Sequence, residues 1–129
     1  MNSHTQALNA AYKPTQADTA ALCDAAADYL DAHGWQRFET GGVGGPACLL
    51  GALTTAVPHT ATRIPNQWAY DEAARAVRRQ LGWTRPNLSA WNDTVARDRR
   101  TVTRLLRATA RTLRSDTPTP KQTSISQKA

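Results

Sequence analysis

One apolar stretch constrains this chain more than any other feature. No charged residue occurs between Glu39 and Arg63, and within that interval the only polar residues of positions 47–57 are two threonines. A helix of this composition is apolar almost all round, which is typical of the buried centre of a bundle. It is too short to cross a bilayer, which requires about 20 residues. The stretch therefore predicts a central, buried helix.

Glycine-rich residues 41–46 directly precede this stretch. Gly45 suits an N-cap and Pro46 the first helical position, so we expect the helix to begin there and to end at Val57, the residue before a proline. Residues 42–47 also match the G-x-G-x-x-A pattern of dinucleotide-binding loops. The strand before that motif and the acidic residue about 20 positions after it are both missing. We interpret the run as a tight turn.

The first amphipathic helix is expected from Thr15, which forms a capping-box pattern with Asp18, to about His33. Gly34 suits the position after its last turn. Trp35 can then fold back onto the helix, as in a Schellman ending.

Two more amphipathic helices are expected at residues 66–81 and 99–114, the second with Asp98 as its N-cap. Residues 87–91 suit one short helical turn. Phe38, in a short mixed segment, is expected to pack. No segment shows a strand pattern, so the sequence predicts an all-α fold: a compact bundle of four main helices with the apolar helix at its centre.

The length of 129 residues indicates a single domain. Residues 1–13 predict a flexible arm and residues 115–129 a disordered tail, which leaves a helical domain at 14–114. Residues 1–60 carry two positive and five acidic residues, a net −3, whereas residues 61–129 carry 14 and five, a net +9. The basic half favours an acidic partner, such as nucleic acid or an acidic protein.

Arginines gather on one face of the last predicted helix. Five fall within a narrow arc opposite its apolar side: Arg100, Arg104, Arg107, Arg111 and Arg114. Trp68 falls on the polar side of its own helix, either as an exposed contact residue or as a cover for the end of the bundle. We interpret these six residues as a binding surface, with protein as the favoured partner and sequence-independent nucleic-acid binding as the alternative.

Three considerations limit this interpretation. The chain has 13 arginines and three lysines, so the face is also consistent with a solvated surface in an arginine-biased composition. The last helix has no aromatic anchor, which argues against membrane binding. An acidic stripe of Asp24, Asp28 and Asp31 offers a complementary surface, which makes self-association conceivable.

Cys48 is the basis of a third, enzymatic interpretation. It falls near the start of the apolar helix, where the helix dipole favours a reactive thiol. His59 as base and Asp93 as orienting group would complete a triad. Cysteine in an apolar helix is more often a core residue, so we predict no enzymatic activity. The spacing of the histidines and of Cys23 and Cys48 fits no zinc signature, so no metal or other cofactor is expected.

The N-terminal residues lack the basic and apolar regions of a signal peptide. We therefore expect a cytoplasmic protein with reduced thiols. Asn92 and Asp93, at the end of the predicted short turn, are expected to cap a neighbouring helix or to bond exposed backbone.

Several short motifs occur in a fixed order: Gly34-Trp35, Cys-Leu-Leu-Gly-Ala-Leu at 48–53, Trp91-Asn92-Asp93 and the amphipathic last helix. Together they resemble a family of small uncharacterised helical proteins, a domain of unknown function, from actinobacteria and their phages. The resemblance covers residues 16–114. It implies a compact helical domain without known catalytic residues. The resemblance leads us to expect a threonine-type N-cap before the last helix, where this sequence has Asp98. Either residue can cap a helix.

Overall fold

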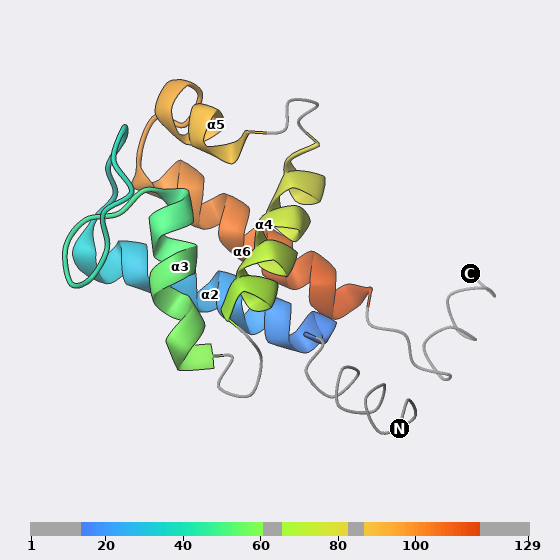
Figure 1. The fold of residues 1–129 in the computed structure, drawn as a ribbon. Helices are drawn as coiled ribbons and strands as arrows, with labels where there is room; N and C mark the ends of the chain where they lie inside the picture. The colour runs from blue at the N-terminus through green and yellow to red at the C-terminus, as the bar shows by residue number, and fades with distance from the viewer. Residues whose placement is uncertain (1–13, 61–65, 83–86, 117–129) are drawn as a thin grey trace.

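The computed structural model describes residues 14–60, 66–82 and 87–116. Those residues form five helices and no strand: α2 (Gln16–His33), α3 (Leu49–Thr60), α4 (Asn66–Leu81), α5 (Leu88–Thr94) and α6 (Arg99–Ser115) (Figure 1). The all-α prediction is confirmed. There are five helices where four main ones were expected, because the predicted turn at 87–91 belongs to a seven-residue helix, α5.

Several predictions fall on other parts of the chain. The expected arm at 1–13 and nearly all of the expected tail at 115–129 lie outside the described residues. Within the described part, no helix is both long and apolar enough to cross a membrane.

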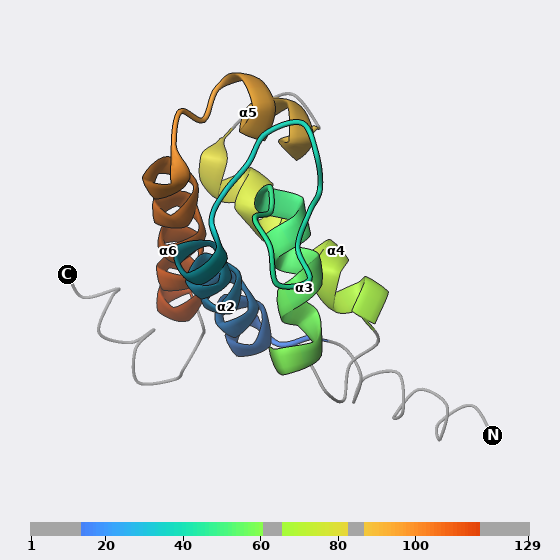
Figure 2. The ribbon, with the colours of Figure 1, turned by 90° about the vertical axis from the view of Figure 1, so that its left-hand side faces the viewer.

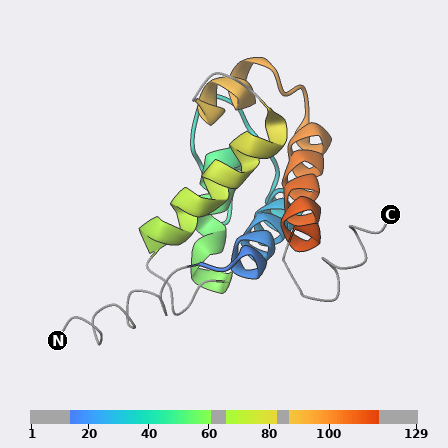
Figure 3. The same cartoon turned by 90° about the vertical axis from the view of Figure 1, so that its right-hand side faces the viewer.

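The two most extensive helix contacts both involve α2, which packs against α6 and against α3. Figure 2 shows α2 between these two helices, and Figure 3 shows α4 lying across α3. The small side chains of α2 explain its position, because Ala20, Cys23, Ala26 and Ala27 are fully buried and let two neighbours approach closely. The apolar helix α3 was expected at the centre, whereas Thr54 is exposed on it.

The start of α2 agrees with its prediction, since Thr15 and Asp18 form both hydrogen bonds of a capping box, each 3.0 Å long. Its end differs. Gly34 has φ +102° and ψ 163°, so the chain leaves in an extended direction instead of the αL turn of a Schellman ending. Trp35 consequently pairs with Ala47 in an isolated bridge.

The predicted bounds of the apolar helix are wrong at both ends, since α3 begins at Leu49 and ends at Thr60. Pro46 and Ala47 do not start the helix because their carbonyl groups accept hydrogen bonds from the loop, at Gly42 and Gln36. The helix continues past Pro58 because a proline in the last turn removes only one helical hydrogen bond.

Candidate functional site

The arginine face of α6 lies against the acidic stripe of α2. Arg107 Nη2 is 2.7 Å from a carboxylate oxygen of Asp28 and 3.3 Å from one of Asp31. Asp24 lies 3.4 Å from Arg107 Nη1 and 2.7 Å from Arg114 Nη1. The hydrogen bond to Asp28 is the main cause of a raised pKa at Arg107. The acidic stripe that made self-association conceivable is therefore engaged within the molecule, with Arg107 and Arg114.

At the other edge of the arginine face, the structure shows no ion pair within the described part of the chain. Arg100, Arg104 and Arg111 are exposed and form no ion pair with any described residue. At 3.6 residues per turn, the three fall within an arc of about 40°. The face thus has a paired edge along α2 and an unpaired edge toward solvent.

Trp68, the sixth residue of the predicted surface, is only partly exposed and packs against the core. This position fits the alternative in which Trp68 covers the end of the bundle. Of the six predicted contact residues, the three arginines of the unpaired edge are left as an open surface.

A buried asparagine organises the α5 end of the molecule. Asn92 has 0% of its surface exposed. Its Oδ1 accepts hydrogen bonds from Trp35 Nε1 at 2.7 Å and from the Leu49 amide at 3.0 Å. Its Nδ2 donates to the Gln36 carbonyl at 3.2 Å. Asn92 therefore caps the first amide of α3 and joins α5 to the loop, as its sequence position predicts.

Neighbouring side chains hold the start of the same loop. Asp93 Oδ1 accepts a hydrogen bond of 2.8 Å from the Phe38 amide. Arg37 donates from Nη2 to the Ala96 carbonyl, and its guanidinium carbon lies 5.6 Å from the Trp35 ring centroid. Residues 37–38 are thus fixed against the segment that follows α5.

Phe38 points outward, contrary to its prediction, with 75% of its surface exposed. Its φ of +73° lies in the left-handed region, which a bulky residue rarely adopts. This turn, together with the hydrogen bond from the Phe38 amide to Asp93, directs the ring away from the core. Val95, 51% exposed, belongs to the segment that Arg37 holds. We call the exposed side chain of Phe38 the Phe38 surface.

A small pocket of about 140 Å³ lies beside Phe38. It is lined by Phe38, Glu39, Thr40, Cys48, Ser89 and Asp93. Cys48 is only 6% exposed, and its Sγ accepts the Gly51 amide at 3.4 Å, so the thiol acts as an N-cap.

The proposed triad does not assemble. Cys48 and Asp93 line the same pocket. His59, however, lies in the last turn of α3, 59 − 48 = 11 residues beyond the cysteine. At 1.5 Å per residue this separation is about 16 Å along the helix. His59 is therefore placed too far along α3 to be the base for Cys48.

The glycine-rich run is closed by hydrogen bonds within the chain. The Tyr29 hydroxyl accepts from the Gly44 amide at 2.8 Å and donates to the Gly45 carbonyl at 2.7 Å. The Gly42 amide donates to Pro46, and the Gly45 amide to Gly42. Because these three glycine amides are occupied, they are not presented to a phosphate group, and the run is a closed turn.

Both cysteines are free thiols in buried positions. Burial, with a smaller contribution from the Asp24 carboxylate, raises the pKa of Cys23 to about 12. In the described part of the chain, no group of three or more His, Cys, Asp or Glu side chains is arranged to hold a metal ion.

The exposure of Phe38 was missed from the sequence. The available signal was the glycine-rich run that follows it, because glycines beside an isolated aromatic residue indicate irregular backbone rather than core packing.

The fold and this site define a small all-α domain in which hydrogen bonds of the buried Asn92 hold the loop at 34–48 against the short helix α5. The sequence profile described as a family of unknown function (DUF6197) matches residues 14–112. The chain belongs to this family, which confirms the predicted membership in a family of unknown function. No curated protein and no solved structure matches the chain significantly.

Proposed function

We propose that the protein is a non-enzymatic helical module that binds another protein through the Phe38 surface. The carrying observation is the 75% exposure of Phe38 on a backbone that is held in place at φ +73°. A non-glycine residue in this region costs about 1–3 kcal/mol, and such strain clusters at binding sites. Fixed aromatic side chains also lose little conformational entropy on binding, which makes them frequent hot spots.

A non-enzymatic role is supported by the surroundings of Cys48. Its thiol caps α3, and the only carboxylate of the predicted triad, Asp93, already accepts the Phe38 amide. The Cys48 thiol and the Asp93 carboxylate thus both have structural roles next to the exposed Phe38 ring.

The test compares Phe38→Gly with Val43→Gly. Val43 is the matched control because it is also apolar, 93% exposed and at positive φ, but lies in the glycine-rich run. Proteins captured from the native host by the parent chain are identified by mass spectrometry, and the affinity of the principal one is measured by calorimetry. We expect Phe38→Gly to weaken the affinity for this partner about 30-fold, the loss typical of a hot spot worth about 2 kcal/mol.

Val43→Gly should bind as the parent does. Equal loss in both variants, or no loss in Phe38→Gly, would count against the Phe38 surface as the binding site.

The second candidate is sequence-independent nucleic-acid binding through Arg100, Arg104 and Arg111. The supporting observation is that these three exposed arginines have no ion pair with any described residue, whereas Arg107 and Arg114 do. Three phosphate contacts predict a slope of about −3 for log affinity against log salt concentration.

This candidate is tested by filter binding to duplex DNA and RNA at low salt. Reversal of all three α6 arginines to glutamate should abolish retention. The control reverses Arg75, Arg78 and Arg79 on α4, which changes net charge equally. Retention that falls alike in both triple variants would indicate a response to net charge alone and exclude a specific α6 face.

We also infer a cytoplasmic location and an actinobacterial or phage origin. Two free, buried thiols are typical of a reducing compartment. The ratio of 13 arginines to three lysines is consistent with a GC-rich genome. Fractionation of the native host tests the location.

A further inference from the structure

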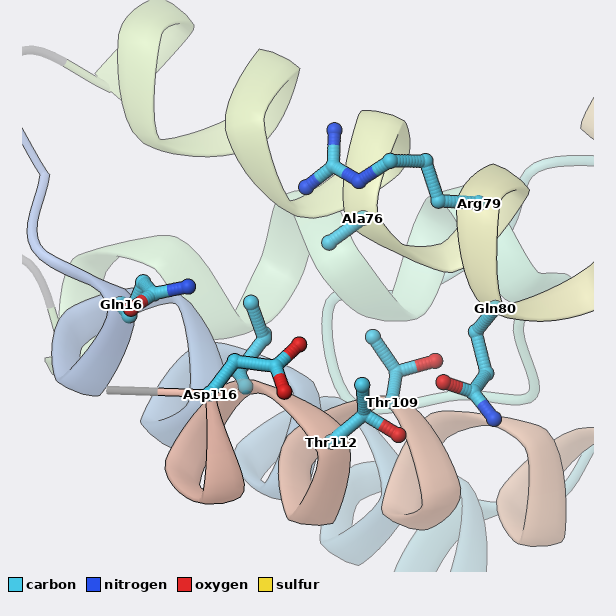
Figure 4. Close-up of a pocket in the computed structure, with 8 residues that line it drawn as sticks. Gln16, Ala76, Arg79, Gln80, Thr109, Thr112 and Asp116 are labelled. Carbon is cyan, nitrogen blue, oxygen red and sulfur yellow. The ribbon is translucent and has the colours of Figure 1, made fainter. Parts of the chain in front are cut away.

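A cavity of about 250 Å³ lies between α4, α6 and the start of α2, and none of its residues belongs to the Phe38 surface (Figure 4). Its polar lining consists of Gln16, Arg79, Gln80, Thr109, Thr112 and Asp116. Ala76 and Leu113 add an apolar wall. The cavity is smaller than the roughly 300 Å³ at which sites for drug-sized ligands begin, so it suits a small metabolite.

Two opposite charges face this space. Figure 4 shows the Arg79 side chain extending from α4 over the cavity, while the Asp116 carboxylate is directed into it from the end of α6. Neither forms an ion pair with the other or with any further described residue. A cation and an anion that line one cavity without pairing with each other can form charge-assisted hydrogen bonds with a ligand that carries both complementary charges.

The remaining polar groups suit such a ligand. The side chains of Gln16, Gln80 and Thr112 make no hydrogen bond to a described residue and supply both donors and acceptors. Thr109 Oγ1 donates to the Leu105 carbonyl at 2.8 Å, which leaves its lone pairs available to accept. The cavity thus offers hydrogen-bonding groups in addition to its two charged side chains.

We propose that this cavity binds a small zwitterion, namely a free α-amino acid with a polar side chain. The Arg79 guanidinium donates to the ligand carboxylate, and the Asp116 carboxylate accepts from its ammonium group. The hydroxyl and amide groups of α4 and α6 contact the polar side chain. Because both charged residues are exposed, binding is expected to be weak, in the millimolar range.

The first experiment titrates the full-length protein with L-glutamine and follows backbone amide signals by NMR. We expect saturable shifts at Gln80, Thr109 and Thr112. Two analogues serve as matched probes: glutaramate lacks the ammonium group, and 4-aminobutanamide lacks the carboxylate. Each should bind at least about tenfold more weakly, the loss of one charge-assisted contact.

The second experiment uses Arg79→Gln and Asp116→Asn, which are conservative changes at exposed positions. Each should weaken glutamine binding about tenfold or more. Arg78→Gln is the control, since Arg78 is the adjacent exposed arginine but does not line the cavity. Absence of saturable shifts with glutamine, equal binding of either analogue, or unchanged binding in Asp116→Asn would each overturn the proposal. The proposed binding of a protein at the Phe38 surface does not depend on any of these outcomes.

Discussion

The α2–α6 interface and the junction of α5 with the loop at 34–48 hold polar side chains in opposite ways. Between α2 and α6, a buried apolar seam is edged by ion pairs whose side chains keep between 30% and 72% of their surface exposed. At the junction, one amide with no exposed surface makes the decisive hydrogen bonds.

The difference has energetic consequences. Exposed ion pairs contribute about 0–1 kcal/mol, because water already solvates the separated charges well. A buried donor or acceptor that loses its partner costs about 1–3 kcal/mol, because no water replaces it. The many charges of α2 and α6 therefore set how these helices align, whereas the single amide of Asn92 determines whether the α5 end stays folded.

Replacing Asn92 by alanine should be strongly destabilising. The change leaves the Trp35 indole N–H, the Leu49 amide and the Gln36 carbonyl without their buried partner. We expect a loss of about 3 kcal/mol in the free energy of unfolding, measured by urea denaturation. Asn87→Ala is the control, because Asn87 caps α5 at an exposed position and should cost only about 1 kcal/mol. Similar losses in both variants would contradict the central role of Asn92.

The same contrast explains what the sequence could predict. The bounds of α4 and the start of α6 follow from periodicity and from Asp98, because an amphipathic face and a cap are local properties. The alignment of Asp24 with Arg107 could not be read from the sequence, since each stripe alone is consistent with a solvated face. Their pairing depends on which helix lies beside α2.

The start of α3 shows why local sequence rules failed at the junction of α5 with the loop at 34–48. Gly45 and Pro46 are good capping residues, yet they lie in the loop because their backbone groups pair with Gly42 of the loop and with Tyr29 of α2. The group that caps Leu49 comes from Asn92, 43 residues away. A tertiary hydrogen bond of this kind outweighs the local capping preference of Gly45 and Pro46, and the residues around Leu49 give no sign of it.

Burial of Cys23 in α2 predicts a dependence of stability on alkaline pH. The folded pKa, about 12, lies above the ordinary value of 9.0, so the folded state retains the thiol proton longer than the unfolded chain. This stabilisation is complete below the ordinary pKa and is lost as pH rises toward the folded pKa. The slope approaches about 1.4 kcal/mol per pH unit within this window. Urea denaturation between pH 8 and pH 10.5 measures it.

Cys23→Ala supplies the comparison for that slope, because it removes the thiol and leaves the other alkaline groups unchanged. The variant should lose stability less steeply with pH than the parent. Parallel pH profiles would show that the Cys23 proton does not contribute.

Replacing Arg107 by glutamine should have a smaller effect, although it removes contacts with three carboxylates. Because the Arg107 side chain is 37% exposed, we expect a loss of about 1 kcal/mol, which 1 M salt should largely remove. Arg111→Gln, on the unpaired edge of the same helix, should leave the free energy of unfolding unchanged. A salt-independent loss at Arg107 would instead indicate that packing of its aliphatic stem dominates.

Phe38→Gly should change stability least, and in the favourable direction. Glycine adopts φ +73° without the steric penalty that phenylalanine bears, and little apolar burial is lost from a ring that is 75% exposed. We expect stability to rise by up to about 1 kcal/mol in urea denaturation, and Val43→Gly to behave alike. The two variants should separate only in partner binding, which Phe38→Gly alone should lose. A loss of stability in Phe38→Gly would mean that the ring supports the fold, and its exposed, strained position would no longer favour a binding role.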